Sequence, residues 1–173
     1  MRRLAMIAAL GALVGMVAGM MTAGPALAGR GPKWEVVTQE PFTLPADFCG
    51  FEIGISWPVL NEYTKILKAA DGSMIFLTTG VDKVTGTNLS NGKSGTSNIS
   101  GPAKVTTFPD GSVTFEGTGL QGLVLSPADA ERFGMPAVGV TVGRRTETID
   151  ADGNVTSFSL QGRVVVDTCA SLS

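Results

Sequence analysis

Three glutamates, Glu52, Glu116 and Glu147, are the side chains best placed for acid–base chemistry, since each lies in a stretch of β-type sequence. If alternate residues of those strands face a closed interior, a buried glutamate there could act as a general acid. No spacing pairs two carboxylates across neighbouring strands, so we interpret all three as solvent-facing. The chain has no histidine, which excludes Ser-His-Asp triads, Cys-His pairs and histidine-ligated zinc or haem. We assign no catalytic residue and expect a non-catalytic protein, with a carboxylate-based enzyme as the less favoured alternative.

Two loops are similar to ligand-binding motifs but depart from them at required positions. Residues 86–94 end in Gly-Lys-Ser, as phosphate-binding loops do, but the spacing is one residue too long and no strand–loop–helix pattern surrounds it. Residues 150–161 begin like a calcium-binding loop. Val155 replaces the glycine required at the sixth position, and Gln161 replaces the glutamate required at the twelfth. We predict ordinary turns at both places, with no metal and no cofactor.

The charged residues give little reason to expect a charged partner. The formal net charge is −2 and only 16% of the residues are charged, so nothing indicates nucleic-acid binding. Arg144 and Arg145 are adjacent, so on a β-strand their side chains point to opposite faces. This pair could bind an anion, but we interpret it as a solvated strand end.

Alternating apolar residues mark the candidate core. The alternation of apolar with small or polar residues along 51–57 and 138–143 is typical of half-buried β-strands. The same side chains could instead line an apolar cavity in a ligand-binding barrel. Core packing needs no further assumption, so the cavity is the alternative. The residues concerned are Phe51, Ile53, Ile55, Trp57, Val138, Val140 and Val142.

Turn signals divide the chain into short strands. An Asx-Gly pair favours a tight hairpin turn because both residues tolerate positive φ, and four such pairs lie between β-type runs. About nine or ten strands result, which predicts an all-β fold: an antiparallel meander forming a β-barrel, with a β-sandwich as the alternative. Ser126, Pro127 and Gly134 delimit one short helix near 127–133. The Asx-Gly pairs begin at Asp71, Asn91, Asp110 and Asp152.

The N-terminus has the features of an export signal. Arg2 and Arg3 precede an uncharged apolar run over 4–21, and Ala26-Leu-Ala28 fits the small-residue cleavage rule. An uncleaved membrane anchor is the alternative, but we expect cleavage after Ala28, no stable membrane anchor and a secreted protein. The expected organisation is a signal peptide at 1–28, an extended lead-in at 29–48 and a single β domain at 49–173.

Two cysteines remain in the exported chain. Cys49 precedes the first strong strand pattern, and Cys169 follows the last one. An even number of cysteines in an oxidising compartment indicates one disulfide, with two buried free thiols as the rival interpretation. If the first and last strands pair antiparallel, their ends meet as in a closed meander, which is why we favour the barrel over the sandwich.

The cysteines and several turn motifs resemble those of known sequences. Cys49-Gly-Phe51 opens the domain, Ser100-Gly-Pro102 precedes Asp110-Gly, and Asp167-Thr-Cys169-Ala closes it. In these motifs the chain resembles a group of small exported actinobacterial proteins of unknown function, from Cys49 to Ser173. The resemblance implies export, a bacterial source and one structural disulfide. It carries no ligand, activity or catalytic residue onto this chain.

A binding module is the function that we expect. It would hold an apolar small molecule in the barrel or an extracellular partner on its loops. A structural protein of the cell envelope, without a small ligand, is the alternative, and we expect a monomer in either case. A filled interior would favour the structural protein, whereas an empty apolar cavity would favour the binding module.

Overall fold

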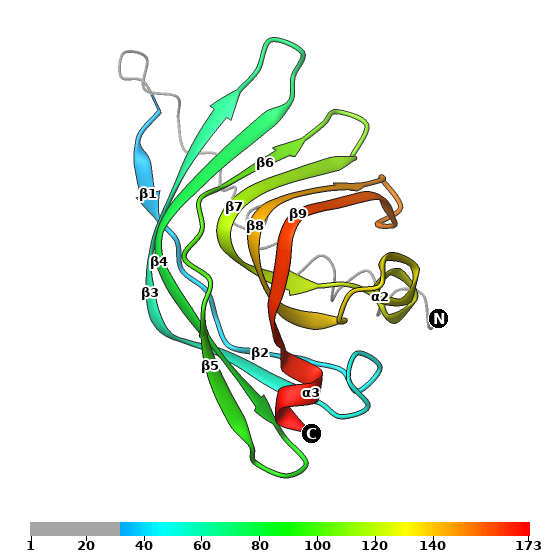
Figure 1. Ribbon diagram of the computed structural model, residues 1–173. Coiled ribbons are helices and arrows are strands. Elements are labelled where there is room, and N and C mark those ends of the chain that lie inside the picture. The colour runs from blue at the N-terminus through cyan, green and yellow to red at the C-terminus, as the bar shows by residue number, and fades with distance from the viewer. Residues whose placement is uncertain (1–31) are drawn as a thin grey trace.

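A computed structural model describes residues 32–173. The expected signal peptide and its cleavage site therefore lie outside the described residues. Most of the described chain is strand, joined by tight turns and two short helices (Figure 1). The strands are β1 (Trp34–Val36), β2 (Phe42–Leu44), β3 (Ile53–Lys68), β4 (Met74–Asn88), β5 (Ser94–Asn98), β6 (Ala103–Thr107), β7 (Val113–Val124), β8 (Val138–Ile149) and β9 (Val155–Asp167), and the helices are α2 (Pro127–Phe133) and α3 (Thr168–Leu172).

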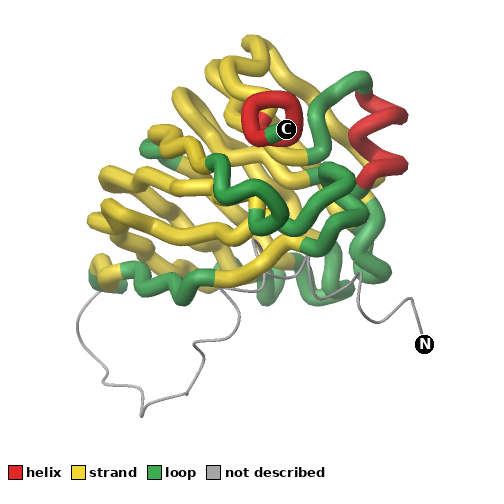
Figure 2. The backbone as a smooth tube through the Cα atoms, turned by 90° about the horizontal axis from the view of Figure 1, so that it is seen from below, coloured by secondary structure: helices red, strands yellow, loops and turns green. Residues whose placement is uncertain are grey.

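All nine strands belong to one antiparallel sheet. Its hydrogen-bonded order is β1-β3-β4-β6-β7-β8-β9, with β2 also pairing with β3 and β5 with β4. The long strands curve around a concave face (Figure 1), and seen from below they lie side by side in one layer (Figure 2). The prediction of an all-β antiparallel fold is confirmed.

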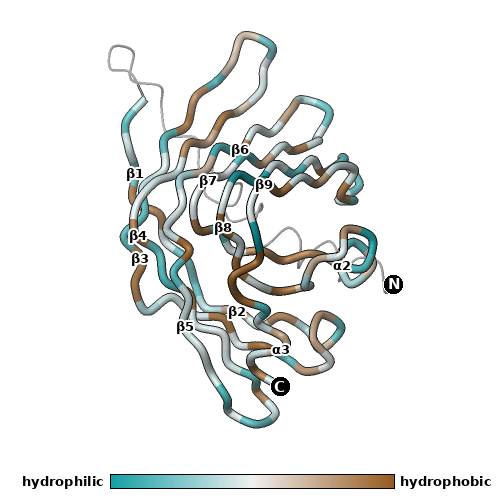
Figure 3. The backbone as a smooth tube through the Cα atoms, in the orientation of Figure 1, coloured by the Kyte–Doolittle hydropathy of each residue, from teal (hydrophilic) through white to brown (hydrophobic). Residues whose placement is uncertain are grey.

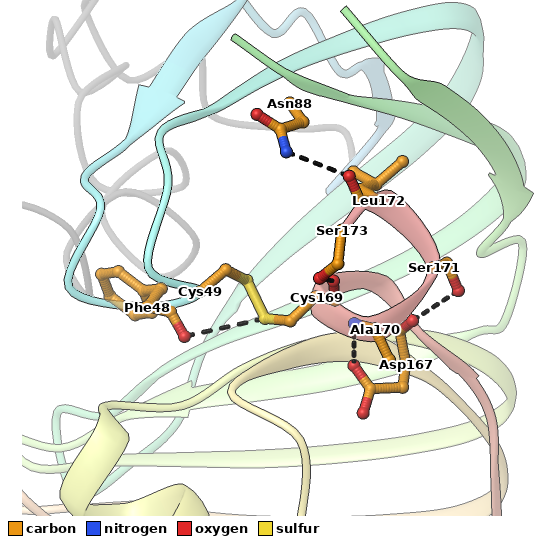
Figure 4. The surroundings of a disulfide bond; sticks show 9 residues. All are labelled: Phe48, Cys49, Asn88, Asp167, Cys169, Ala170, Ser171, Leu172 and Ser173. Atoms are coloured by element: carbon orange, nitrogen blue, oxygen red, sulfur yellow. Dashed lines mark hydrogen bonds between the residues drawn. A yellow bond between two sulfur atoms is a disulfide. The ribbon is translucent and has the colours of Figure 1, made fainter. Parts of the chain in front are cut away.

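The pairing of the strands does not close this sheet into a barrel. In the described chain β9 pairs with β8 alone, and β1 and β2 form the opposite edge on β3. The predicted barrel required the first and last strands to pair and so bring the cysteines together. Instead, the disulfide between Cys49 and Cys169, whose Cα atoms are 5.1 Å apart, joins the turn before β3 to helix α3 (Figure 4). A covalent bond thus links the two edges where backbone hydrogen bonds do not.

Helix α3 has no counterpart among the predicted elements. The last part of β9 is hydrophobic, brown in Figure 3, and leads directly into this helix. The carboxylate of Asp167 accepts a hydrogen bond of 3.0 Å from the backbone nitrogen of Ala170 and caps the helix (Figure 4). Leu172 is buried, and its carbonyl oxygen accepts a 3.0 Å hydrogen bond from Nδ2 of Asn88. One helical turn is too short for a periodic sequence signal, yet it anchors the C-terminus against β4.

The predicted turns and helix are present. Hairpin turns at the Asx-Gly pairs join β3 to β4, β4 to β5, β6 to β7 and β8 to β9, and the glycine of each pair has a positive φ. Helix α2 spans Pro127–Phe133, as predicted. The hydroxyl of Ser126 accepts a 3.1 Å hydrogen bond from the backbone nitrogen of Asp129, and Gly134 ends the helix in the left-handed conformation.

Two irregularities change which residues face the concave side of the sheet. The pairing of β3 with β4 shifts register between Ser56 and Val59. In β8, Gly143 has a φ of +125°, and a Cβ atom there would lie 2.3 Å from the carbonyl oxygen of Gln161. Side chains of a regular strand alternate between faces, so the extra residue in β3 moves the residues that follow it to the other face.

The apolar residues form two clusters. One joins α2 to strands β4 and β6 to β9, and the other lies beside α3 and the disulfide. Of the apolar residues singled out in the sequence, the buried ones are Ile53, Ile55, Val138 and Val140, and the partly buried ones are Phe51, Trp57 and Val142.

Candidate binding cavity

The concave face of the sheet holds a cavity of about 490 Å³. Its walls come from β3, β4, β6, β7 and β8, with contributions from β1, β2, β5 and α3. The volume falls within the range of small-molecule sites, roughly 300–1,000 Å³. Apolar side chains make up most of the wall, among them Phe42, Ile55, Trp57, Val84, Val138 and Val140.

The predicted apolar residues divide between this wall and the core. The ring of Trp57 packs against that of Phe42, with centroids 5.7 Å apart, and both rings line the cavity. Ile53 is fully buried and belongs to the core cluster beside α3. The residues that line the cavity are Ile55, Trp57, Val138 and Val140, and those outside its lining are Phe51, Ile53 and Val142.

Two carboxylates on neighbouring strands, Glu62 on β3 and Asp82 on β4, also line the cavity. Asp82 is 5% exposed, and its Oδ1 atom has no hydrogen-bond partner. Burial raises the pKa of Asp82 to about 7, and the negative charge of Glu62 adds to this rise. Burial likewise raises the pKa of Glu62. This acidic pair therefore retains protons at a higher pH than exposed carboxylates do.

Ser100 supports Asp82 at the point where β4 changes partners. β4 pairs with β6 over Met74–Thr78 and with β5 over Lys83–Thr87, so Asp82 lies between the two ladders. Its backbone nitrogen donates a 2.8 Å hydrogen bond to the Ser100 hydroxyl, and that hydroxyl donates a 3.0 Å hydrogen bond to its carbonyl oxygen. The Ser100 side chain, together with the backbone nitrogen of Ile99, which donates a 3.0 Å hydrogen bond to the same carbonyl oxygen, therefore substitutes for the strand that is missing at this position.

Arg145 brings a positive charge to the same cavity although it is only 6% exposed. Its Nη1 atom donates a 2.7 Å hydrogen bond to the carbonyl oxygen of Gly122, and its guanidinium carbon lies 4.3 Å from the centre of the Phe115 ring. A Cβ atom at Gly117 would come within 2.7 Å of that ring, so the glycine makes room for Phe115. The Nε atom of Arg145 is buried and has no hydrogen-bond partner.

Glu147 follows on the same strand and is 7% exposed. Burial raises the pKa of Glu147, while the charge of Arg145 opposes this rise and that of Asp129 adds to it. Within residues 32–173, the one ion pair with nitrogen and oxygen within 4.0 Å joins Lys104 to Glu116. Arg145 and Glu147 therefore act on each other at a distance rather than as a contact pair.

The solvent-facing interpretation is wrong for Glu147 and Arg145. The side chains of β8 that line the cavity are Val138 and Val140 before Gly143, but Arg145, Glu147 and Ile149 after it. The alternation of the strand changes phase around Gly143, which moves the two charged positions to the concave side.

The solvent-facing interpretation is right for the other charged residues that the sequence analysis named, Glu52, Arg144 and Glu116. Glu52 and Arg144 are exposed, and Glu116 lies half-buried in its ion pair with Lys104. Arg144 and Arg145 do point to opposite faces of β8, one to solvent and one to the cavity.

The acidic pair was not found by the sequence patterns because of the irregularity in β3. If the alternation of Ile53 and Ile55 continued along β3, the side chain of Glu62 would point away from the cavity. The register shift between Ser56 and Val59 changes the alternation, so Glu62 points into the cavity instead. Pro58 was the available signal, since a proline within a strand often marks a bulge. Asp82 carried no comparable signal.

The two motif-like loops form turns. Residues 86–88 belong to β4 and residues 89–93 turn into β5. At the other loop, the carboxylate of Asp150 accepts hydrogen bonds from the backbone nitrogens of Asp152 and Asn154, at 3.0 and 2.9 Å, and these bonds lower its pKa. Among residues 32–173, no group of three or more His, Cys, Asp or Glu side chains could hold a metal ion.

Comparisons with known proteins leave the cavity as the basis for a functional argument. No protein-family model, curated protein or solved structure matches the chain. No helix in the described part of the chain is long and apolar enough to cross a membrane.

Proposed function

We propose that this protein is an exported binding protein that holds an apolar small molecule in the cavity on the concave face of its sheet. The observation that carries the proposal is a cavity of about 490 Å³ with mostly apolar walls. Binding sites for small molecules combine such walls with a few polar groups that orient the ligand. The acidic pair and Arg145 are polar groups of this kind.

The proposal includes export and a barrel-like mode of action. Cleavage after Ala28 would release the chain into an oxidising compartment, where the Cys49–Cys169 disulfide is stable. The curved sheet would act as a barrel whose gap is covered by the lead-in, α3 and the bound molecule. A structural protein of the cell envelope, with no small ligand, is the competing function.

Uptake of a neutral apolar dye, phenylnaphthylamine, tests the proposal. We expect saturable uptake at one site, seen as enhanced fluorescence. Val84→Trp should weaken uptake about tenfold or more, because the new side chain occupies the cavity. Val81→Trp is the matched control, since Val81 lies on the same strand, is 46% exposed and does not line the cavity.

Two results would contradict the binding function. The first is the absence of saturable dye uptake by the wild-type protein. The second is equal uptake by wild type and Val84→Trp with a change in Val81→Trp, which would place the dye on the outer surface. Native mass spectrometry of protein from its own culture medium complements the dye. An extra mass that denaturation removes would be the natural ligand.

Acid–base catalysis is a second candidate, favoured by one observation. A carboxyl group with a pKa of about 7 beside a cavity can give and take protons at neutral pH, and Asp82 is such a group. The mass of a bound compound, compared before and after prolonged incubation, separates the two functions. A binding protein returns the compound unchanged, whereas an enzyme returns a product that Asp82→Asn fails to form.

A further inference from the structure

We propose that the ligand of this cavity carries a carboxylate, which pairs with the guanidinium group of Arg145 while the apolar body of the ligand lies along the walls. The inference rests on the proposed binding function and specifies the chemical class of the ligand. Its starting point is a buried cation that lines the cavity and has no carboxylate in contact with it.

A buried guanidinium without a counter-charge is an unfavourable arrangement. Removing a charge from water carries a large penalty unless a partner of opposite sign compensates for it. Acidic side chains reduce this penalty by taking up a proton, but arginine stays charged in proteins. Arg145 therefore keeps its charge in the folded protein, and because Glu147 acts on it only at a distance, a negative charge in contact with it would have to come from a ligand.

The contacts of Arg145 position the group without neutralising it. The carbonyl oxygen of Gly122 accepts one hydrogen bond, and the face of Phe115 lies beneath the guanidinium carbon. Both partners are uncharged, and the Nε atom has no hydrogen-bond partner. With Nε enclosed and one Nη1 proton donated to Gly122, the remaining N–H groups of Nη1 and Nη2 form the end of the guanidinium group that would receive the two oxygens of a carboxylate.

Glu147 does not fill this role. It lies beyond 4.0 Å of the Arg145 nitrogens, since the described chain has its one ion pair within that distance at Lys104 and Glu116. Burial raises the pKa of Glu147, and the charge of Arg145 offsets this rise only in part.

The charge balance favours a carboxylate over the other head groups. An amine could pair with the acidic pair, but burial raises the pKa values of Glu62 and Asp82, so these carboxyl groups can take up protons instead of binding a cation. A phosphate brings more negative charge than one arginine balances. A single carboxylate matches the one cation in charge and the guanidinium edge in shape.

A series of ligands with one body and three head groups tests the inference. Decanoic acid, decanol and decylamine are titrated at neutral pH against the protein loaded with phenylnaphthylamine, and displacement is read by fluorescence. We expect decanoate to displace the dye at a concentration about tenfold lower than decanol, with decylamine the weakest.

Arg145→Met should remove the preference for decanoate over decanol while leaving decanol displacement unchanged. Arg144→Met is the matched control, because it removes the same charge from the neighbouring, exposed position and should keep the preference. Arg145→Lys should retain part of the preference, since it keeps the charge and loses the planar edge. A purely structural role of Arg145 would affect all three compounds alike.

Each alternative outcome has a distinct meaning. Equal displacement by decanoate and decanol in the wild type, or a preference for decylamine, overturns the carboxylate inference and leaves the binding function standing. Failure of all three to displace a bound dye overturns it as well. Absence of saturable dye uptake removes the binding function itself. The wild-type series decides the matter even if Arg145→Met does not fold.

Discussion

Reduction of the Cys49–Cys169 disulfide is expected to lower the free energy of unfolding by about 4 kcal/mol. The two cysteines are 120 residues apart, so the bond removes much of the conformational freedom of the unfolded chain. No backbone ladder within the described chain joins β9 to β1 or β2, so besides the disulfide these edges are held by the packing of α3, including buried Leu172 against Leu44 in one apolar cluster. Urea titration of the oxidised and reduced protein measures the difference, and the melting temperature should fall by about 10 °C.

The variant Cys49→Ser/Cys169→Ser is the control for effects of the reductant. It should unfold at the same urea concentration as the reduced wild type and should not respond to reductant. Unfolding curves that coincide for oxidised and reduced protein would contradict the structural role of the bond. A parallel loss of dye uptake is expected, because α3 lines the cavity and the disulfide holds it there.

Asp82→Asn should make the protein more stable at pH 8 and flatten the pH dependence of its stability. Because the pKa of Asp82 rises from 3.8 to about 7 on folding, the folded state holds this proton more tightly. The resulting stability is fully present at a pH below 3.8, the pKa of Asp82 in the unfolded chain. It is lost as the pH rises through about 7, the pKa of Asp82 in the folded protein. After allowance for solvent screening, the wild type should lose about 2 kcal/mol between pH 5 and pH 8.

The pH range avoids carboxylates that act in the opposite sense. Hydrogen bonds lower the pKa values of the turn residues Asp71, Asp110 and Asp150, whose contribution to stability is lost as the pH falls below their ordinary range. Glu62 and Glu147 have raised pKa values, so Asp82→Asn should leave a reduced slope rather than none. Asp152→Asn, at an exposed turn, is the control. Parallel stability curves for wild type and Asp82→Asn would refute the assignment.

The features that the sequence predicted are those determined by a few neighbouring residues. An Asx-Gly pair forms its turn largely by itself, and the hairpin at Asp110 closes with the carboxylate accepting a 2.9 Å hydrogen bond from the backbone nitrogen of Ser112. The helix at 127–133 likewise depends on Ser126 and Gly134 at its ends. The pairing of Cys49 with Cys169 followed from there being two cysteines.

The polar part of the cavity could not be predicted, because its formation depends on contacts between strands rather than on a few neighbouring residues. Glu62, Arg145 and Glu147 face inwards because the alternation of β3 and of β8 changes phase, whereas Asp82 follows the regular alternation of β4. The inward position of Arg145 follows a change of phase along β8 between Val140 and Arg145, the segment that contains Gly143 and its close approach to Gln161 of β9. The inward position of Glu62 depends on a register shift against β4. The prediction of a closed barrel was wrong for a related reason. It assumed that the cysteines lie at the ends of two paired strands, but a turn and a helix carry them.

The open edges of the sheet bear on how long a guest molecule would reside in the cavity. Widening the wall of a closed barrel separates hydrogen-bonded strands and exposes their amide groups. Between β9 and the β1/β2 edge of this sheet there is no ladder to separate. Phe42 of β2 and Trp57 of β3 line the cavity, and rotation of side chains such as these is fast compared with the opening of a sheet. Loading and unloading can therefore proceed with every strand pair intact, so dwell times would depend on the fit of the guest rather than on unfolding of its host.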